Sequence, residues 1–403
     1  MQQFIKNKYQ RVYNKVMKYA SIILPIPIPK VLSGAGSVKM LAKEKKLKKL
    51  KKVLIVTDKV LVKLNLLDDL LTSLKENDID YVIYDAVRPN PTIQNVENGR
   101  TLYKKNKCDG IIAFGGGSPI DCAKIIGARV SNPYMSVKMM KGLFRVFLPI
   151  PPFFCIPTTA GTGSETTIAA VITNPDTHEK FAINDIKLVP EIAVLDPNLM
   201  LGLPKHITST TGLDALTHAV EAYIGLNGTR FTDEKAKNAV KLIFENLEEV
   251  YNNPQNTEAR NNMAIASFDA GLAFTRAYIG YVHAIAHNMG GMYGVPHGLA
   301  NAIILPYVLE YYGESIINKL SDLAKVANIG ENKDNNKILA QKFIERIKEM
   351  NKNMEIPTFI KELNTSDIPL IAKRALKEAN PAYPVPEIMS YNDCENLIKK
   401  LLP

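Results

Sequence analysis

The sequence predicts two domains, an α/β domain with a parallel sheet followed by an all-α domain. Its 403 residues exceed the usual size of one hydrophobic core. Up to about residue 205, short apolar runs alternate with helical stretches, which is typical of a parallel sheet covered by helices on both faces. Beyond that point the chain consists of long segments with helical periodicity. We therefore divide it into residues 1–25, 26–205 and 206–403.

Residues 1–25 are expected to form a basic helix. Its apolar side chains recur with a helical period, at Ile5, Tyr9, Val12, Tyr13, Val16 and Ala20. Lysine and arginine residues lie between them. Such a helix could dock on the rest of the protein, join a dimer contact or lie on a membrane surface, and we prefer docking. The proline-rich residues 23–37 should be extended and then turn at Gly34 and Gly36.

The α/β domain reads as buried strands separated by helices. Strands are expected at 53–57, 81–84 and 110–114, and helices at 59–76, at 95–105 and from about residue 118. Further extended runs lie at 153–156, 169–173 and 192–195. In the second domain, helices are expected at 210–224, 232–251, 257–276, 282–292, 297–312, 314–328, 336–350 and 367–378.

Two polar loops of the first domain are candidates for binding a dinucleotide. Three glycines, Gly115 to Gly117, follow a buried strand and precede a helix, so backbone N–H groups and the helix N-terminus can approach a phosphate. The second loop, TTAGTGSETT at 158–167, is rich in hydroxyl groups. Ordinary tight or flexible turns are the alternative for both. Neither loop is a GxGxxG fingerprint.

Asp58 ends a predicted strand, but it precedes the glycine triplet by 57 residues instead of following it, so a standard Rossmann order is not expected. Its carboxylate could accept a hydrogen bond from an adenosine ribose. A charge there would repel a 2′-phosphate, which favours NAD over NADP. The alternative is that Asp58 caps the next helix.

Three of the six histidines, His283, His287 and His297, lie within fifteen residues. His283 and His287 are four apart and share one face of a helix, and a break containing glycines and a proline precedes His297. Asp214 and His218 have the same spacing on another predicted helix. Two such pairs indicate a metal site, with scattered polar core or surface side chains as the alternative.

Composition narrows the class of protein. Hydrophobic residues make up 46% and charged residues 22%, as in ordinary globular proteins. The four cysteines form no CxxC pair, which indicates reduced thiols in the cytoplasm. No apolar run approaches the ~20 residues that span a bilayer, and no signal peptide is recognised. Of the net charge of +10, residues 1–52 carry +13, but the basic run at 43–52 lacks nucleic-acid-binding signatures and is expected to be a solvated helical face.

These motifs together resemble the iron-containing (group III) alcohol dehydrogenase family. The similarity runs from about Ile26 to the C-terminal region and is carried by VLIVTDK, PNPT, GGGSPID, TTAGTGSE, GLDALTHAVEAY, VHAIAHNMG and PHGLANAIILP. The resemblance implies an N-terminal domain of the dehydroquinate synthase-like, Rossmann-related kind that binds NAD(P), a helical domain that binds the metal, and a cleft between them.

Matched position by position, the resemblance also implies the site residues. The metal ligands would be Asp214, His218, His283 and His297, and His287 would be the catalytic residue near nicotinamide and substrate. The cofactor contacts would be Asp58, Asn90, Gly116, Gly117, Ser118, Asp121, Thr158, Thr159, Thr162 and Lys180. Asn288 replaces a proline found in many members, and the basic N-terminal helix lies outside the shared core. His178 and His206 match no family ligand and are expected on loops or at the surface.

The expected activity is hydride transfer between NAD(P) and a small primary alcohol or its aldehyde, with a divalent metal as Lewis acid. Three imidazoles and one carboxylate suit Fe²⁺ or Zn²⁺ and argue against Mg²⁺ or Ca²⁺. We expect Fe²⁺, with Zn²⁺ as the alternative, and NAD, with NADP as the alternative. We also expect a cytoplasmic homodimer or higher homo-oligomer without nucleic-acid or membrane partners. The competing functions are a zinc-dependent glycerol-type polyol dehydrogenase, a 3-dehydroquinate synthase-like enzyme, and a noncatalytic protein that binds RNA or membranes through residues 1–52.

Overall fold

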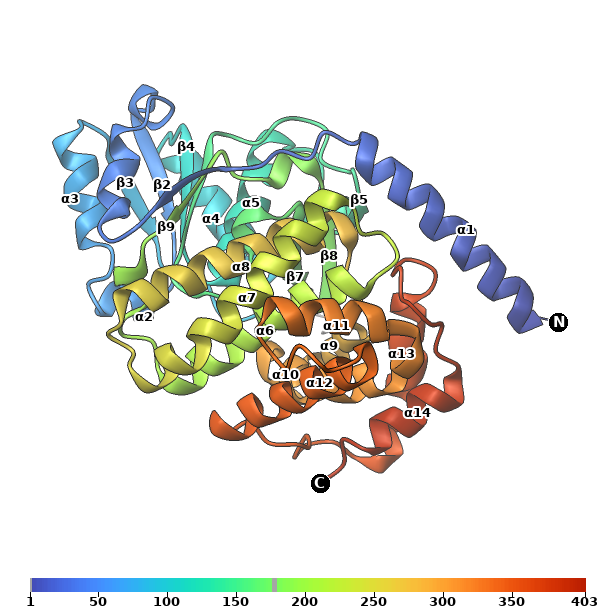
Figure 1. Ribbon diagram of the computed structural model, residues 1–403. Helices are drawn as coiled ribbons and strands as arrows, with labels where there is room; N and C mark the ends of the chain where they lie inside the picture. The colour runs from blue at the N-terminus through green and yellow to red at the C-terminus, as the bar shows by residue number, and fades with distance from the viewer. Residues whose placement is uncertain (1, 176–179) are drawn as a thin grey trace. The chain divides into compact units, whose positions relative to one another are not determined.

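The computed structural model describes residues 2–175 and 180–403, which leaves His178 outside the described residues. The chain divides into two units, one made of Ile26–Gly202 and the other of Met1–Pro25 with Leu203–Pro403 (Figure 1). The first unit is α/β and the second is helical, so the predicted fold class is confirmed. Among the described residues, no helix combines the length and the apolar character that crossing a bilayer requires.

The main sheet of the α/β unit has six strands, and all of its strand pairs are parallel. In spatial order the strands are β1 (Lys30–Ser33), β9 (Ile192–Leu195), β6 (Phe153–Pro157), β4 (Gly110–Gly115), β2 (Lys52–Val56) and β3 (Asp80–Tyr84). Figure 1 shows β2, β3 and β4 side by side at the blue and cyan end of the colour scale. β4 lies inside the sheet, with Val53 opposite Gly110 on one side and Ile111 opposite Phe153 on the other.

Alternate residues of these strands enter two hydrophobic cores, as the two-residue period of a strand requires. Val53 and Ile55 pack with α3 and the 3-10 helix η1 on one face. Leu54 and Val56 pack with α4 and α5 on the other. The helices of this unit are α2 (Lys59–Lys63), α3 (Asp68–Glu76), α4 (Ile93–Lys105) and α5 (Gly117–Ser131), with 3-10 helices η1 (Ser37–Lys43), η2 (Leu47–Lys49), η3 (Val137–Met140), η4 (Ser164–Thr166), η5 (Ile186–Leu188) and η6 (Pro197–Met200).

Two features of this unit differ from the sequence prediction. The single helix predicted at 59–76 is two helices, because Asn65 adopts a left-handed conformation (φ +54°) that asparagine tolerates better than most residues. The predicted strand at 169–173 belongs to a separate three-stranded sheet of β5 (Gly142–Leu143), β8 (Lys180–Asn184) and β7 (Ala169–Thr173), in which β7 and β8 are antiparallel. Neither β5 nor β8 was predicted.

The second unit contains helices and no strand among its described residues. Its helices are α6 (Lys205–Ile224), α7 (Arg230–Asn252), α8 (Thr257–Ala277), α9 (Tyr281–Tyr293), α10 (His297–Tyr312), α11 (Ile317–Val326), α12 (Asn336–Asn353), α13 (Ile368–Ala379) and α14 (Tyr391–Lys399), with 3-10 helices η7 (Gly313–Ile316) and η8 (Thr365–Asp367). α6 packs against α7, α8 and α10, and α9 packs against α10 and α13. α6 is buried around most of its circumference, as expected for a helix inside a bundle.

The N-terminal helix α1 (Gln2–Ile23) docks on the helical unit, but through polar side chains. Gln10 Nε2 donates to Asn380 Oδ1 (2.9 Å), and Asn14 Nδ2 donates to the carbonyl of Pro381 (2.8 Å). Arg11 donates to the carbonyls of residues 385 and 386 at 2.6 and 2.8 Å. Three side chains of the predicted apolar stripe, Tyr9, Val12 and Val16, are instead exposed. The sequence therefore predicted the helix, but not which of its faces docks.

Candidate functional site

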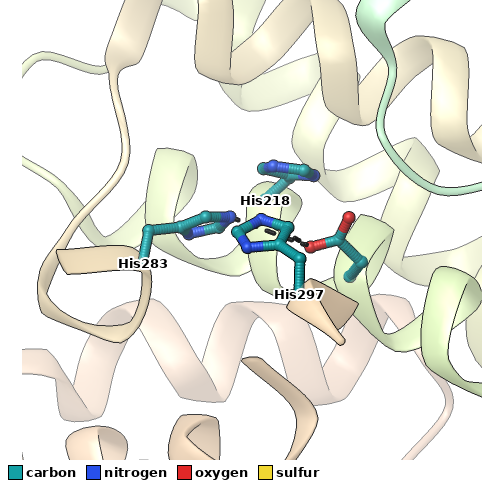
Figure 2. A group of neighbouring side chains, drawn as sticks. His218, His283 and His297 are labelled. Carbon is teal, nitrogen blue, oxygen red and sulfur yellow. Dashed lines mark ion pairs between the residues drawn. The ribbon is translucent and has the colours of Figure 1, made fainter. Parts of the chain in front are cut away.

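Four potential metal ligands meet inside the helical unit, and Figure 2 shows the three histidines around a carboxylate. α6 carries Asp214 and His218 one turn apart, α9 carries His283, and α10 begins at His297. One ligand atom from each residue lies within 4.8 Å of the others. Nε2 of His283 and Nε2 of His297 lie 3.9 and 3.6 Å from Asp214 Oδ1.

These separations suit a shared ion. Two donors that each lie about 2.1 Å from one ion are at most about 4.2 Å apart. Both measured distances to Asp214 Oδ1 are below that limit. A contraction of roughly half an ångström brings the whole group within it. The cluster therefore has the size of a metal site.

The turn between α9 and α10 brings His297 to the cluster. α9 ends at Gly294, whose φ of +72° is the left-handed conformation that commonly terminates helices, and Pro296 directly precedes α10. Gly298 then allows α10 to approach α6 closely, because a Cβ at that position would lie 2.3 Å from the carbonyl oxygen of Thr210 and 3.4 Å from Asp214 Cβ. Local sequence thus sets the distance between His297 and the ligand pair of α6.

The electrostatics of His283 favour a neutral imidazole. Burial and the neighbouring His218 and His297 hold its pKa well below the usual value. Its Nε2 is buried and has no hydrogen-bond partner among the described residues, and an unpaired buried polar atom costs stability. A neutral imidazole nitrogen is also the form that binds a metal. The residues present therefore fit a metal ion.

Glu221, which the sequence analysis missed, fixes His283 in place. Its carboxylate accepts hydrogen bonds from the backbone N–H groups of Gly280 (2.9 Å) and Val282 (2.8 Å) at the start of α9, and lies 2.6 Å from His283 Nδ1. Burial raises the pKa of Glu221 to about 7, against the effect of the two backbone bonds. When Nδ1 donates to Glu221, Nε2 is the nitrogen left free for a metal. The position was predictable, since Glu221 follows Asp214 by seven residues, two turns along one helix face.

Asn301 holds the aspartate. Its Nδ2 donates to Asp214 Oδ1 (2.7 Å) and lies 3.2 Å from His297 Nε2. Asn301 follows His297 by four residues on α10, so the same spacing rule could have identified it. The carboxylate is thereby oriented before any ion binds.

His287 lies beside the cluster without belonging to it. Its ring stacks on that of His297, with centroids 5.3 Å apart and planes inclined by 15°. Its Nδ1 lies 2.6 Å from Oε1 of Glu378 on α13, and its side chain is 37% exposed. Glu378 is 91 residues away along the chain, and no local pattern pointed to it.

The two loops predicted to bind a dinucleotide, at residues 116–118 and 158–162, lie within the α/β unit at the carboxyl ends of β4 and β6. The N–H of Thr158 donates to the carbonyl of Gly115 (3.1 Å), which joins the two loops. A Cβ on Gly116 would lie 3.2 Å from Thr159 Oγ1, and one on Gly117 would lie 3.0 Å from Thr162 Cγ2. No side chain of the described residues caps the N-terminus of α5, so its first N–H groups can receive an anion.

Two side chains of α5 brace the second loop from within the protein. Asp121 accepts hydrogen bonds from Ser164 Oγ (2.7 Å) and from the N–H of Val171 (2.9 Å). Lys124, which was not predicted, is fully buried and donates through Nζ to the carbonyls of Ser164 (2.7 Å), Thr167 (2.9 Å) and Ala169 (2.7 Å). The bonds of Asp121 therefore order the loop, and its contact with a cofactor stays a prediction.

Asn90 and Lys180, two further predicted cofactor residues, form a chain of hydrogen bonds to Ser118, while Asp58 lies at the start of a helix. Lys180 Nζ donates to Asn90 Oδ1 (2.8 Å), and the N–H of Asn90 donates to Ser118 Oγ (3.3 Å). Asp58 Oδ1 accepts the N–H groups of residues 60 and 61 at 2.8 and 3.1 Å, so it caps α2. This is the alternative role given for Asp58 above, and ribose binding by it stays a prediction. His206 is exposed on α6, as expected.

Comparison with known proteins decides the family. The family model for iron-containing alcohol dehydrogenase matches residues 28–197, and the model for the C-terminal part of the same family matches residues 208–402. The chain belongs to the iron-containing alcohol dehydrogenase family. Residues 1–27, which include α1, lie outside both matches. The predicted family is thus confirmed, and with it an oxidoreductase that acts on CH–OH groups.

Relatives within the iron-containing alcohol dehydrogenase family match nearly the whole chain. The 1,3-propanediol dehydrogenase of Citrobacter freundii is 41% identical over 353 residues, which cover 86% of this chain and 90% of the relative. The NAD-dependent methanol dehydrogenase of Bacillus methanolicus is 36% identical over 379 residues, or 93% and 98% of the two chains. A crystal structure of 1,3-propanediol oxidoreductase matches with a TM-score of 0.90 at 36% identity and covers 94% of this chain and 100% of that chain.

Proposed function

We propose that this protein is a metal-dependent NAD(P) alcohol dehydrogenase that interconverts small primary alcohols and their aldehydes. The observation that carries the proposal is the largely buried cluster of Asp214, His218, His283 and His297, in which the neutral His283 has an Nε2 with no hydrogen-bond partner among the described residues. These four side chains are the proposed metal ligands. The names of the propanediol and methanol dehydrogenases among its relatives support a short alcohol as substrate.

The reaction removes a hydride and a proton from the alcohol, so that RCH₂OH and NAD⁺ give RCHO, NADH and H⁺. A divalent ion in the cluster would supply Lewis-acid assistance at the substrate oxygen. His287 is the proposed proton acceptor, because it lies next to the cluster, is partly exposed, and carries an imidazole, the side chain that most often transfers protons in enzymes. In the aldehyde-reducing direction His287 would return the proton.

Iron is the proposed metal. The donor set of three imidazoles and one carboxylate suits Fe²⁺ and Zn²⁺, and Zn²⁺ binds more tightly at most such sites. Aerobic preparations are therefore expected to contain mixed metal and to be partly inactive. Metal analysis alongside activity after anaerobic loading with Fe²⁺ tests this, and full activity with zinc alone would refute the preference for iron.

NAD is the proposed cofactor, held by the loops at Gly116, Gly117 and Ser118 and at Thr158, Thr159 and Thr162. Two observations support a diphosphate site: the two loops contact each other, and no side chain caps the N-terminus of α5 among the described residues. Asn90, Asp121 and Lys180 are proposed as further contacts. The carboxylate of Asp58 is proposed to disfavour the 2′-phosphate of NADP. Asp58→Ala should then raise kcat/KM with NADP relative to NAD, and an unchanged ratio would remove Asp58 from this role.

We also propose a cytoplasmic homo-oligomer without nucleic-acid or membrane partners. The four cysteines are free and buried, which fits a reducing compartment. Val12 and Val16 belong to the exposed apolar stripe of α1, which could pack against another copy. In the basic region, Lys30, Lys46 and Lys52 form ion pairs with Glu44, Glu191 and Asp80. Light scattering on the wild type and on Val12→Glu/Val16→Glu tests the oligomer, and a wild-type monomer would contradict it.

The decisive experiment follows NADH formation from a panel of short alcohols by protein loaded anaerobically with Fe²⁺. Asp214→Ala should abolish both metal binding and NADH formation. A preference for glycerol with zinc would instead indicate a polyol dehydrogenase. Absence of substrate-dependent NADH with any alcohol would contradict the proposed function.

A further inference from the structure

We propose that Glu378 and Tyr383 are positioning residues that hold the ring of His287 in one orientation and one tautomer, with Nε2 free of a proton. The inference rests on the proposed function, since it gives His287 its proton-accepting atom. It also gives α1 a role, because α1 fixes the segment that carries Tyr383.

The first contact is the pair of His287 and Glu378. Glu378 Oε1 lies 2.6 Å from His287 Nδ1, and Tyr383 Oη donates to the same Oε1 at 2.8 Å. The hydroxyl of Tyr383, as a hydrogen-bond donor to Oε1, favours the ionised form of the carboxyl. An ionised carboxylate only accepts hydrogen bonds, so Nδ1 of a neutral His287 must carry the proton. Nε2 is then an acceptor.

This orientation matters because ring contacts alone do not set the tautomer of His287. Its side chain is 37% exposed, and its ring contacts two residues of the cluster, stacking on His297 and meeting His283 edge-on with centroids 6.0 Å apart. Stacking defines the plane of a ring but not which nitrogen carries the proton. A carboxylate at Nδ1 settles the tautomer, as buried aspartates do for catalytic histidines in other enzymes.

Tyr383 is in turn held by its own segment and by α1. Tyr383 lies four residues beyond the last residue of α13, Ala379, and its N–H donates to the carbonyl of Ala379 (2.6 Å). Asn380 accepts hydrogen bonds from Gln10 of α1 (2.9 Å) and from Tyr281 of α9 (3.0 Å). The segment from Asn380 to residue 386 is therefore fixed on two sides, at the point where it presents Tyr383 to Glu378.

α1 adds four more bonds to this segment, and in one of them Gln10 Nε2 donates to the carbonyl of Tyr383 (3.4 Å). Asn14 donates to the carbonyl of Pro381, and Arg11 donates to the carbonyls of residues 385 and 386. α1 lies outside both regions that match the family models, so these hydrogen bonds come from a part of the chain beyond them. The contacts connect α1 through Tyr383 and Glu378 to His287.

The test compares Glu378→Gln, Glu378→Ala and Tyr383→Phe with the wild type. We expect kcat to fall by about 100-fold in Glu378→Ala with little change in KM, because proton transfer is lost and substrate binding is kept. Glu378→Asp should recover part of kcat. Metal content should be unchanged in all variants. The matched control is Glu387→Gln, an exposed carboxylate near the same segment, which should retain wild-type kcat.

A readout independent of turnover is the ¹⁵N spectrum of the histidine side chains in zinc-loaded protein, where six histidines contribute. His287→Ala identifies the His287 signals. The wild type should show a protonated Nδ1 and an unprotonated Nε2 at this residue, and Glu378→Ala should show a mixture of tautomers. Glu378→Leu, which fills similar space but cannot accept a hydrogen bond, serves if the alanine variant does not fold.

Three results would overturn the proposal: an unchanged tautomer and kcat in Glu378→Ala or Glu378→Leu, loss of metal from the Glu378 variants, or a further loss of kcat when Glu378→Ala is added to His287→Ala. The last would show that Glu378 acts independently of His287. The failure of the proposed function is distinguishable, since the wild type itself would then form no NADH.

Discussion

Replacing Gly298 with alanine tests how tightly helix packing sets the metal site. The new Cβ would lie 2.3 Å from the backbone carbonyl oxygen of Thr210, an atom that cannot move without moving α6. Normal contact needs about 1 Å more, and overpacking of this kind costs about 1–3 kcal/mol. The adjacent His297 would move with α10. His297 Nε2 lies 3.6 Å from Asp214 Oδ1. A shift of about 1 Å would move the two atoms further apart than the roughly 4.2 Å that a shared ion permits.

The assay measures metal content and the melting temperature of Gly298→Ala with and without added metal. We expect substoichiometric metal and a smaller metal-dependent rise in melting temperature than in the wild type. The matched control is Gly291→Ala in α9, where a Cβ would meet no atom within 4 Å and alanine favours the helix. Wild-type metal affinity in Gly298→Ala would refute the packing argument.

Three further predictions concern buried groups. Glu221→Gln should weaken metal binding about 10- to 100-fold by loosening His283, as measured by competition with a chelator, and unchanged affinity would count against this role. Glu165, whose pKa burial raises from 4.5 to about 7, binds an extra proton in the folded state between these values, so the free energy of unfolding falls as pH rises through this window. In denaturant titrations, Glu165→Gln should lose this pH-dependent decline, which amounts to about 3 kcal/mol at most in the wild type. An equally steep decline in the variant would contradict this prediction. The four buried thiols, with pKa values raised by burial to about 11 at Cys108 and about 12 at Cys394, should react with a thiol reagent only after unfolding, and rapid labelling of the native protein would disagree.

The sequence predicted elements whose signal is local. The apolar runs of β2 and β4 and the i, i+4 pair of Asp214 and His218 are each visible within a few residues, and the structure places them as expected. The helix predicted at 59–76 was wrong because one left-handed residue, Asn65, is enough to divide it. Apolar periodicity did not identify the docked face of α1, since that face binds through side-chain amides and a guanidinium.

Residues that act through tertiary contacts divide into two kinds. Glu221 and Asn301 lie four to seven residues from a proposed ligand on the same helix, so helical spacing could have identified them. Glu378 and Lys124 could not be found in this way, because their partners lie on other elements, 91 residues away for Glu378 and 40 to 45 for Lys124. Only the three-dimensional arrangement reveals that a carboxylate lies against His287.

The central claim is that one ion is held by an aspartate and three imidazoles from three helices. Anomalous diffraction at the iron edge, from crystals loaded anaerobically with Fe²⁺, tests it most directly. The account predicts one strong peak per chain within about 2.3 Å of a ligand atom from each of Asp214, His218, His283 and His297. A peak bound by other residues, or no peak in protein that forms NADH, would contradict it.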